Sequence, residues 1–244
     1  MTALIEATDV RKTYGDKVVL ADVSLSLEPH DVVCLIGSSG SGKSTLLRCL
    51  NLLEDVDDGV IEFEGKEISD PRIDRREVRS RMGMVFQAYN LFPHMTVLDN
   101  CTLAPRRVHG VPKKEAEERA RGLLAQFGLA DQADKHPDRM SGGQQQRAAL
   151  VRALCTQPTL LLLDEITAAL DPELVGDVLT IVRDLAEQGT TMILATHEMS
   201  FARDIATTVC FLDQGRILEQ GPPAEIFHHP REDRTREFLA RVLG

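Results

Sequence analysis

The sequence contains the stretch Gly37-Ser38-Ser39-Gly40-Ser41-Gly42-Lys43-Ser44, which fits the pattern G-x-x-x-x-G-K-S/T without a mismatch. The nearly continuous apolar run 31–36 precedes it and is typical of a strand buried on both faces. Helical spacing follows over residues 44–53. A small-residue loop between a strand and a helix turns backbone N–H groups and the positive end of the helix dipole toward one anion. The stretch therefore predicts a phosphate-binding loop for a nucleoside triphosphate.

The residues of this loop have separate expected roles. We expect Lys43 to reach the β- and γ-phosphates and the Ser44 hydroxyl to ligate Mg²⁺, while Thr45 can add a further phosphate contact. The alternative is a chance Gly/Ser turn, and the flanking strand and helix argue against it. The other nucleotide contacts of the loop are expected from Ser38, Ser39, Gly40, Ser41 and Gly42.

A second signal is a run of four leucines, 160–163, that ends in Asp164 and Glu165. Such a strand places its terminal acids at the carboxyl edge of the sheet, where α/β sheets bind ligands. Asp164 would hold Mg²⁺, directly or through water, and Glu165 would polarise the attacking water. An ordinary acidic loop after a core strand is the alternative, and the phosphate loop upstream favours the catalytic interpretation.

Strand and helix signals alternate along most of the chain, which implies a mostly parallel α/β sheet. Three consecutive helical segments with few strand signals between them indicate a helical insertion, which Pro158 closes. The expected helices, besides 44–53, are 95–104, 113–127 and 141–156 in this insertion, then 172–187, and two short ones from residue 222 on, ending with 235–243. The expected strands, besides 31–36, are 4–10, 18–20, 23–27, 60–64, 84–87, 159–163, 190–195, 208–212 and 216–219.

Composition restricts the class of partner. The chain of 244 residues carries a formal net charge of −10, which argues against nucleic acid. No apolar run approaches the roughly 20 residues that cross a bilayer, so we expect any membrane link to run through a partner. Five widely spaced cysteines form no C-x-x-C pair, so neither a zinc site nor a disulfide framework is expected. A basic cluster with interleaved acids predicts a solvated, ion-paired helix face at Arg72, Arg75, Arg76, Arg79 and Arg81.

The expected helix 141–156 opens with Met140-Ser141-Gly142-Gly143-Gln144-Gln145-Gln146-Arg147. Ser141 suits the N-cap position, and the turn is another anion site. Alone, an ordinary helix cap would be the simpler interpretation. The string closely resembles the signature sequence LSGGQ of ABC ATPases, however, with Met140 in place of leucine. That exchange conserves apolar volume.

Further elements of the ABC ATPase pattern follow in the family's order. Gln87, expected to end the strand 84–87, resembles the glutamine that senses Mg²⁺ and couples to the transmembrane partner. His197 resembles the switch histidine that contacts the γ-phosphate. The resemblance thus implies that Glu165, His197 and Gln87 are catalytic, and that Ser44, Gln87 and Asp164 hold the metal.

Two more strings belong to the resemblance. Tyr14 resembles the aromatic residue that stacks on adenine, and Asp171 lies in the string 169–172, which resembles the D-loop. One departure is Ile166-Thr167-Ala168, where the family commonly has Pro-Thr-Ser. Losing the proline and the serine hydroxyl could loosen or retune the D-loop, but Glu165 and His197 are present, so we do not expect an inactive site.

The resemblance covers essentially the whole chain and implies one ABC ATPase domain with the P-loop NTPase fold. That fold has a mostly parallel core sheet, an N-terminal antiparallel β-subdomain and an inserted α-helical lobe. The expected limits are a catalytic core of residues 1–88 and 159–221, a helical lobe of 89–158 and a C-terminal tail of 222–244.

ATPase domains of this family pair head to tail, so that each ATP lies between the phosphate loop of one copy and the signature of the other. One set of motifs cannot complete a site, which implies a homodimer that binds ATP and Mg²⁺. In that dimer the partner copy would contact the nucleotide through Ser141, Gly142, Gly143, Gln144 and Asp171.

Finer strings resemble the ATPases of polar amino-acid importers. The implied partners are a transmembrane permease and, indirectly, an extracytoplasmic solute-binding protein, with the chain on the cytoplasmic face of the membrane. An importer of another small solute, or a non-transport membrane complex such as one for cell-wall remodelling, is the alternative. The strings are 83–97, 197–203, 219–223 and 234–239.

One apolar set, Phe92, Met95 and Val97, leaves two interpretations open. These side chains could dock a helix of the permease, or they could belong to the core of the helical lobe.

Overall fold

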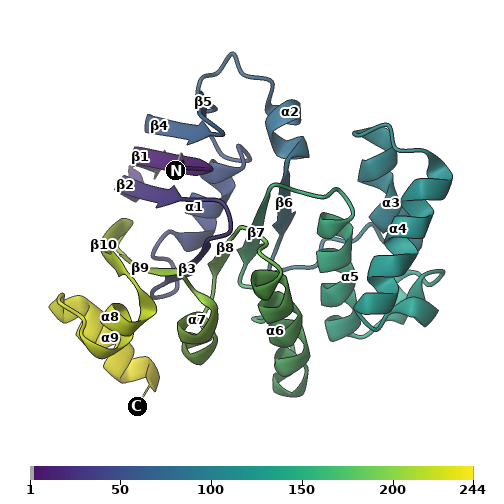
Figure 1. Cartoon of the computed structure of the whole chain (residues 1–244). Coiled ribbons are helices and arrows are strands. Elements are labelled where there is room, and N and C mark those ends of the chain that lie inside the picture. The colour runs from purple at the N-terminus through teal and green to yellow at the C-terminus, as the bar shows by residue number, and fades with distance from the viewer. Residues whose placement is uncertain (1–2, 244) are drawn as a thin grey trace.

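The computed structural model describes residues 3–243 and shows a twisted core sheet with a helical lobe at one side (Figure 1). The core strands are β3 (Val32–Ile36), β6 (Met82–Val85), β7 (Leu160–Asp164), β8 (Met192–Ala195), β9 (Thr208–Asp213) and β10 (Arg216–Gly221). Their order is β10-β9-β3-β8-β7-β6, and every neighbouring pair is parallel except β9 and β10. β3 and β7 are buried along their whole length, which explains their unbroken apolar runs.

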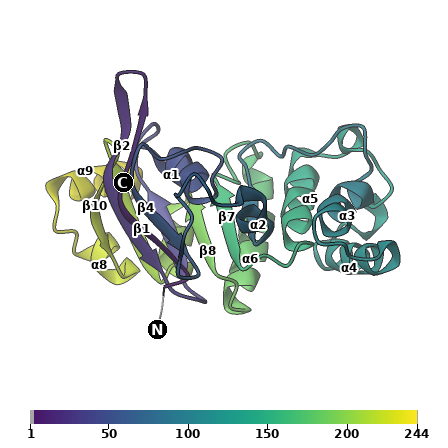
Figure 2. The same ribbon diagram turned by 90° about the horizontal axis from the view of Figure 1, so that it is seen from above.

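A second, antiparallel sheet is built from the N-terminal part of the chain. It has the order β2-β1-β4-β5, with β1 (Ile5–Tyr14), β2 (Lys17–Leu27), β4 (Asp58–Phe63) and β5 (Lys66–Glu67). Helix α1 (Lys43–Leu50) buries Leu46, Leu47 and Leu50 in a hydrophobic core that also contains side chains of both sheets. The β1–β2 hairpin extends beyond the rest of the molecule (Figure 2).

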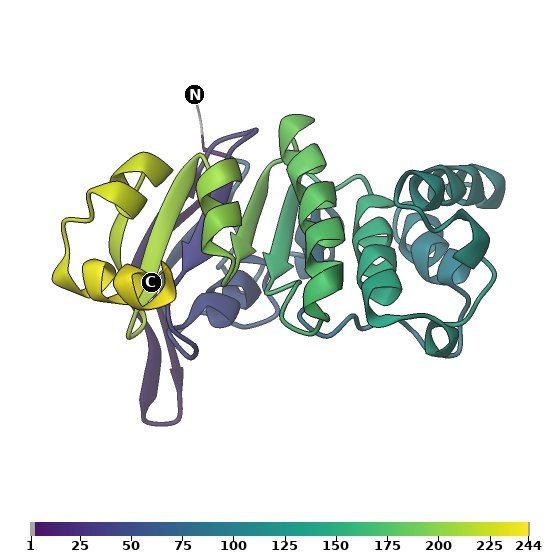
Figure 3. The same cartoon turned by 90° about the horizontal axis from the view of Figure 1, so that it is seen from below.

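Helices cover the other face of the core sheet. Helix α6 (Pro172–Glu187) begins with proline, whose missing N–H costs nothing there, and it buries Val178, Val182 and Leu185 at helical spacing. Helices α7 (Met199–Ile205), α8 (Pro223–His228) and α9 (Asp233–Leu243) lie on the same side (Figure 3). Alternate side chains of β3 and β7, as of β8 and β9, enter the two cores on opposite faces of the sheet.

The helical lobe lies between β6 and β7 in the sequence and consists of α3 (Val97–Arg107), α4 (Lys113–Gln126) and α5 (Gly142–Leu154). Two short 3₁₀ turns, Ala130–Gln132 and Pro137–Arg139, connect α4 to α5, and α2 (Arg75–Ser80) precedes β6. Among residues 3–243, no helix combines the length and the apolar content that a bilayer span requires.

These elements confirm the predicted fold class: a mostly parallel core sheet, an antiparallel β-subdomain and an inserted set of helices. The predicted residue limits of the catalytic core, the helical lobe and the C-terminal tail stay a prediction, because they concern which parts of the chain move independently.

Two expected strands, 18–20 and 23–27, form the single strand β2. Asp22 between them has a positive φ of 57°, and the pairing register with β1 shifts between Val23 and Leu20. The intervening residues are therefore a β-bulge and not a turn. The sequence pattern did not separate these two cases, because a bulge is defined by the partner strand.

The expected strand 84–87 is wrong at both ends, since β6 runs from Met82 to Val85. β6 is the edge of the sheet, and its pairing with β7 ends at Val85 opposite Leu163. Gln87 therefore lies past the strand, in a bend, and its side chain is exposed.

For the apolar set Phe92, Met95 and Val97, the sequence leaves open both a core position in the helical lobe and a surface position that could dock the permease. Val97 is fully buried as the first residue of α3, after Thr96, whose Oγ1 accepts the N–H of Asp99 at 3.1 Å. Phe92 is 43% exposed. Val97 thus belongs to the core, while Phe92 lies at the surface.

Candidate active site

The phosphate loop joins β3 to α1. Gly42 is the N-cap of α1 and has a φ of +112°, a left-handed conformation that glycine adopts without strain. A Cβ there would lie 2.8 Å from Leu20 Cδ2 and 2.9 Å from Val19 O, so the space also requires glycine. No side chain caps the helix, so the N-terminal N–H groups of α1 are available to an anion.

Lys43 lies inside the loop and is buried. Its Nζ donates to Gly37 O at 3.0 Å and to Ser38 O at 3.2 Å, and it lies 3.5 Å from Glu165 Oε1. Burial lowers the pKa of the Lys43 ammonium, and the nearby Glu165 and Asp164 carboxylates oppose that shift. Ser41 Oγ is buried without a hydrogen-bond partner among the described residues. A buried cation, an unpaired hydroxyl and uncapped N–H groups fit a phosphate chain.

Asp164 and Ser44 form a pair of oxygen donors beside this loop. The Ser44 hydroxyl donates to Asp164 Oδ1 at 2.7 Å. Asp164 ends β7 and is 3% exposed. Burial raises the pKa of its carboxyl, and the hydrogen bond from Ser44 works in the opposite direction. A carboxylate and a hydroxyl side by side are ligands of the kind that Mg²⁺ takes in nucleotide sites, so the residues fit that ion.

Glu165 follows β7 and His197 follows the neighbouring strand β8, and their side chains are in contact. The hydrogen bond between His197 Nε2 and Glu165 Oε1 measures 2.9 Å. Glu165 has a φ of +46°, a backbone conformation that is costly for any residue other than glycine. Its N–H donates to Ala195 O at 3.0 Å. The adjacent β8 therefore fixes the Glu165 backbone, and with it the direction of the carboxylate.

These groups meet because β3, β8 and β7 are neighbours and parallel. Their carboxyl ends share one edge of the sheet, where α/β folds bind ligands. Of the residues expected at the site, the structure brings together Lys43, Ser44, Asp164, Glu165 and His197.

Other expected residues lie apart from this cluster. Tyr14 is at the tip of the β1–β2 hairpin, 45% exposed, with Lys12 Nζ 5.3 Å from its ring centroid. Gln87 is exposed beyond β6, and Asp171 is the exposed N-cap of α6. The described contacts of these three include none with the phosphate loop.

The signature segment opens α5. Ser141 Oγ accepts the N–H of Gln144 at 3.3 Å, and Gln144 Oε1 accepts the N–H of Ser141 at 3.0 Å, a complete capping box. The start of α6 packs beside it, because a Cβ on Gly143 would lie 3.1 Å from Leu174 Cδ1. The predicted N-cap role of Ser141 is confirmed, and the expected contacts to the nucleotide of a second copy stay a prediction.

Sequence reasoning missed two residues close to these elements. Tyr89 Oη donates to Ala169 O at 3.1 Å, and Arg152 donates to the carbonyls of Tyr89 and Asn90. Partners 62 to 80 residues apart leave no local pattern that could have indicated them.

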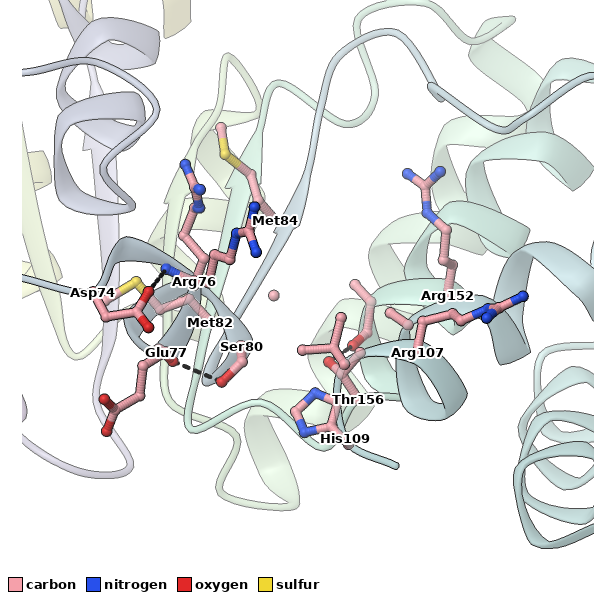
Figure 4. Close-up of a pocket in the computed structure, with 15 residues that line it drawn as sticks. Asp74, Arg76, Glu77, Ser80, Met82, Met84, Arg107, His109, Arg152 and Thr156 are labelled. Atoms are coloured by element: carbon pink, nitrogen blue, oxygen red, sulfur yellow. Dashed lines mark hydrogen bonds between the residues drawn. The ribbon is translucent and has the colours of Figure 1, made fainter. Parts of the chain in front are cut away.

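A groove of 920 Å³ runs between α2 and β6 on one side and α3 and α5 on the other (Figure 4). Its lining has two arginines on each wall and two carboxylates on the first wall, so the groove is positive although the chain is strongly negative. The basic groups are Arg76, Arg79, Arg107 and Arg152, together with His109, and the acids are Asp74 and Glu77.

The predicted ion-paired helix face is therefore correct only in part. Arg72 pairs with Asp70, Arg75 with Asp55, and Arg81 with Glu64. Arg76 and Arg79 instead line the groove.

The fold and the sheet-edge site define a P-loop nucleoside triphosphatase. The ABC transporter family profile matches residues 20–168, which is more than half of the chain. The chain belongs to this family, as an ATP-binding subunit, and is an ATPase.

Several relatives match over nearly their whole length. The glutamine transport ATP-binding protein of Geobacillus stearothermophilus is 50% identical, over 96% of this chain and 97% of the relative. The general L-amino acid transport ATP-binding protein of Rhizobium johnstonii is 48% identical, over 98% and 93%. The glutamate transport ATP-binding protein of Corynebacterium glutamicum is 47% identical, over 99% and 100%.

Solved ATP-binding cassettes share the fold. One, a dimer in a post-hydrolysis state bound to ADP and Pi, has a TM-score of 0.81 at 30% identity, over 90% of this chain and 98% of the other. Another, cbiO1 from Clostridium perfringens, part of the ABC transporter complex cbiONQ, has a TM-score of 0.83 at 27% identity, over 99% and 98%. A homodimer and a membrane permease as partners agree with these matches.

Proposed function

We propose that the chain hydrolyses ATP to power an amino-acid importer. The observation that carries the proposal is the cluster of Lys43, Ser44, Asp164, Glu165 and His197 at one sheet edge. The relatives described above are amino-acid transport ATP-binding proteins, and the similarity extends over nearly the full chain.

The cluster supplies the groups that phosphoryl transfer to water requires. Lys43 would leave the carbonyls of Gly37 and Ser38 for the phosphates, and the dipole of α1 would add to its attraction. Glu165 would then be free to accept a hydrogen bond from the attacking water, with His197 orienting its carboxylate. Ser44 and Asp164, joined by Gln87 on the family resemblance, would hold Mg²⁺, which neutralises phosphate charge when bound.

A second copy would complete the nucleotide site. The signature segment has hydroxyl, amide and N–H groups but meets no phosphate loop within its own chain. In a head-to-tail homodimer, Ser141, Gly142, Gly143 and Gln144 of one copy and its Asp171 would face the nucleotide of the other. Tyr14, exposed at the hairpin tip, would stack on the adenine.

The positive groove is the surface we assign to the permease. It lies between the core sheet and the helical lobe. Its lining residue Arg152 donates to the carbonyls of Tyr89 and Asn90, in the segment that follows Gln87. A permease segment with acidic side chains would complement its four arginines. This contact would place the chain on the cytoplasmic face of the membrane, with a solute-binding protein acting on the opposite side.

The variant Glu165→Gln tests this function. It keeps the shape and the hydrogen-bonding side chain but removes the base, so hydrolysis should fall by about 10²- to 10⁴-fold while ATP binding persists and a stable ATP-bound dimer accumulates. Size-exclusion chromatography with ATP and a phosphate-release assay measure both. An ATPase rate near wild type would remove Glu165 from its role. Cells lacking the gene that keep normal uptake of glutamine, glutamate and other amino acids would instead contradict the transport part.

A further inference from the structure

One side chain touches two of the segments that the proposed dimer requires. Tyr89, two residues after Gln87, donates its hydroxyl to Ala169 O at 3.1 Å. Ala169 lies between Glu165 and the start of α6, in the D-loop string. The hydrogen bond therefore ties the segment after Gln87 to the segment after the catalytic glutamate.

The same hydroxyl lies against the signature. A Cβ built on Gly142, the first residue of α5, would be 2.7 Å from Tyr89 Oη and 3.7 Å from its Cζ. Since 2.7 Å is too close for a carbon and an oxygen that are not bonded, Gly142 leaves the space that the hydroxyl occupies. Leu170 Cδ2 reaches the same position at 3.9 Å, so the D-loop string and the signature meet at this point.

Helix α5 also holds the backbone of this tyrosine. The Arg152 guanidinium donates to Tyr89 O at 3.2 Å and to Asn90 O. Burial lowers the pKa of Arg152, yet the group stays charged at any physiological pH. Two hydrogen bonds from one planar fork fix the direction in which the tyrosine leaves the backbone.

We propose that Tyr89 is a positioning residue for ATP hydrolysis in the dimer. Its hydroxyl sets the D-loop carbonyl and the first turn of the signature helix in one arrangement. A displacement of Gln87 in one nucleotide site is then passed to the groups that face the partner's nucleotide. This inference rests on the proposed function, because the groups it positions act only in an ATP-bound dimer.

The hydrogen bond from Tyr89 Oη to Ala169 O contributes little to the stability of the fold. Tyr89 is half-buried, Ala169 is exposed, and the carbonyl that loses the hydroxyl can bond to water instead. An effect on turnover can therefore be separated from an effect on folding.

The variant Tyr89→Phe removes one oxygen atom and keeps the ring. We expect kcat to fall about three- to tenfold, with KM for ATP within about twofold and the thermal midpoint unchanged, as for an interaction made mainly in the transition state. The matched control is Thr180→Val, which removes another exposed hydroxyl donor, bonded to Gly176 O at 2.9 Å on α6. A Tyr89→Phe kcat equal to that of the control would overturn the inference.

Glu165→Gln is measured in parallel to keep the two proposals apart. If Glu165→Gln abolishes hydrolysis while Tyr89→Phe is indistinguishable from the control, the function stands and only the role of Tyr89 fails. If Glu165→Gln remains active, the assignment of the site itself is wrong.

A double-mutant cycle provides a second, independent measurement. In the wild-type background, Gly142→Ala must displace the Tyr89 hydroxyl, whereas in Tyr89→Phe the nearest ring atom is 3.7 Å away. We expect the kcat loss from Gly142→Ala to be at least about twofold smaller in the Tyr89→Phe background. Equal losses in the two backgrounds would mean that the hydroxyl does not occupy this position in the working enzyme.

Discussion

Two helices of this protein begin after a glycine- and serine-rich turn, and their first turns differ in how the N–H groups are used. At α1, the N-cap is Gly42 in a left-handed conformation, and no side chain accepts a hydrogen bond from the helix. At α5, Ser141 and Gln144 cap each other's N–H groups in a capping box. The first helix start is thus open to a ligand, while the second is partly capped by its own side chains.

The charges around the two helix starts differ as well. Lys43, Asp164 and Glu165 surround the first, and all three are buried or partly buried. The signature residues Ser141–Gln144 are neutral. A cation in a low-dielectric loop attracts phosphate more strongly than the neutral donors of the signature turn do. In the proposed dimer, each chain would therefore contribute unequally to the two nucleotide sites.

The largest effect is expected from Lys43→Ala, which tests the difference in phosphate binding between the two helix starts. Removing the buried ammonium leaves the phosphates without their cation and Glu165 without its nearest positive neighbour. We expect ATP affinity of the monomer to fall on the order of a hundredfold or more, which is about 2.7 kcal/mol. Equilibrium binding of a fluorescent ATP analogue measures it. Ser141→Ala is the matched variant at the other helix and should leave monomer affinity within about twofold, so equal losses would contradict the division of roles.

The phosphate-loop side of this comparison could be predicted from the sequence because its determinants are contiguous. Lys43 and Ser44 belong to one short pattern, and Asp164 and Glu165 end one apolar run, so local order already implies their place on a parallel sheet. His197 required the family resemblance, since one histidine after a strand carries no signal by itself.

The remaining features depend on partners that are distant in sequence. The end of β6 before Gln87 is set by its pairing with β7, and the bulge at Asp22 is set by the pairing of β2 with β1. The contacts of Tyr89 with Ala169 and Gly142 join three segments that only the folded chain brings together. Periodicity and motif spacing are local, so they contain no information on such pairings.

An intermediate effect is expected at the signature helix. Ser141→Ala removes the acceptor for the Gln144 N–H and so opens half of the capping box. The loss should lower the free energy of unfolding by about 1 kcal/mol, or about 2–4 °C in the thermal midpoint for a domain of this size. Differential scanning calorimetry of the nucleotide-free chain measures it. A midpoint unchanged relative to Thr180→Val would show that the capping box contributes nothing to the fold.

The smallest effect should be a gain in stability at the phosphate-loop side. Burial raises the pKa of Asp164, so the folded chain holds that proton more tightly than the unfolded chain does. The destabilising charge is therefore absent at low pH. Its cost grows as pH rises above the ordinary carboxyl pKa of 3.8 and up through the raised pKa of the folded chain.

Asp164→Asn keeps an oxygen for the Ser44 hydroxyl and removes the charge. With chelator present and no nucleotide, the variant should melt up to about 2 °C higher than wild type at neutral pH, and the gain should vanish toward pH 4. Hydrolysis by the same variant should collapse, because the carboxylate that lowers the stability of the nucleotide-free chain is the one that would hold Mg²⁺. A neutral-pH midpoint below wild type would mean that Lys43 and Ser44 more than compensate the cost of burying the Asp164 charge.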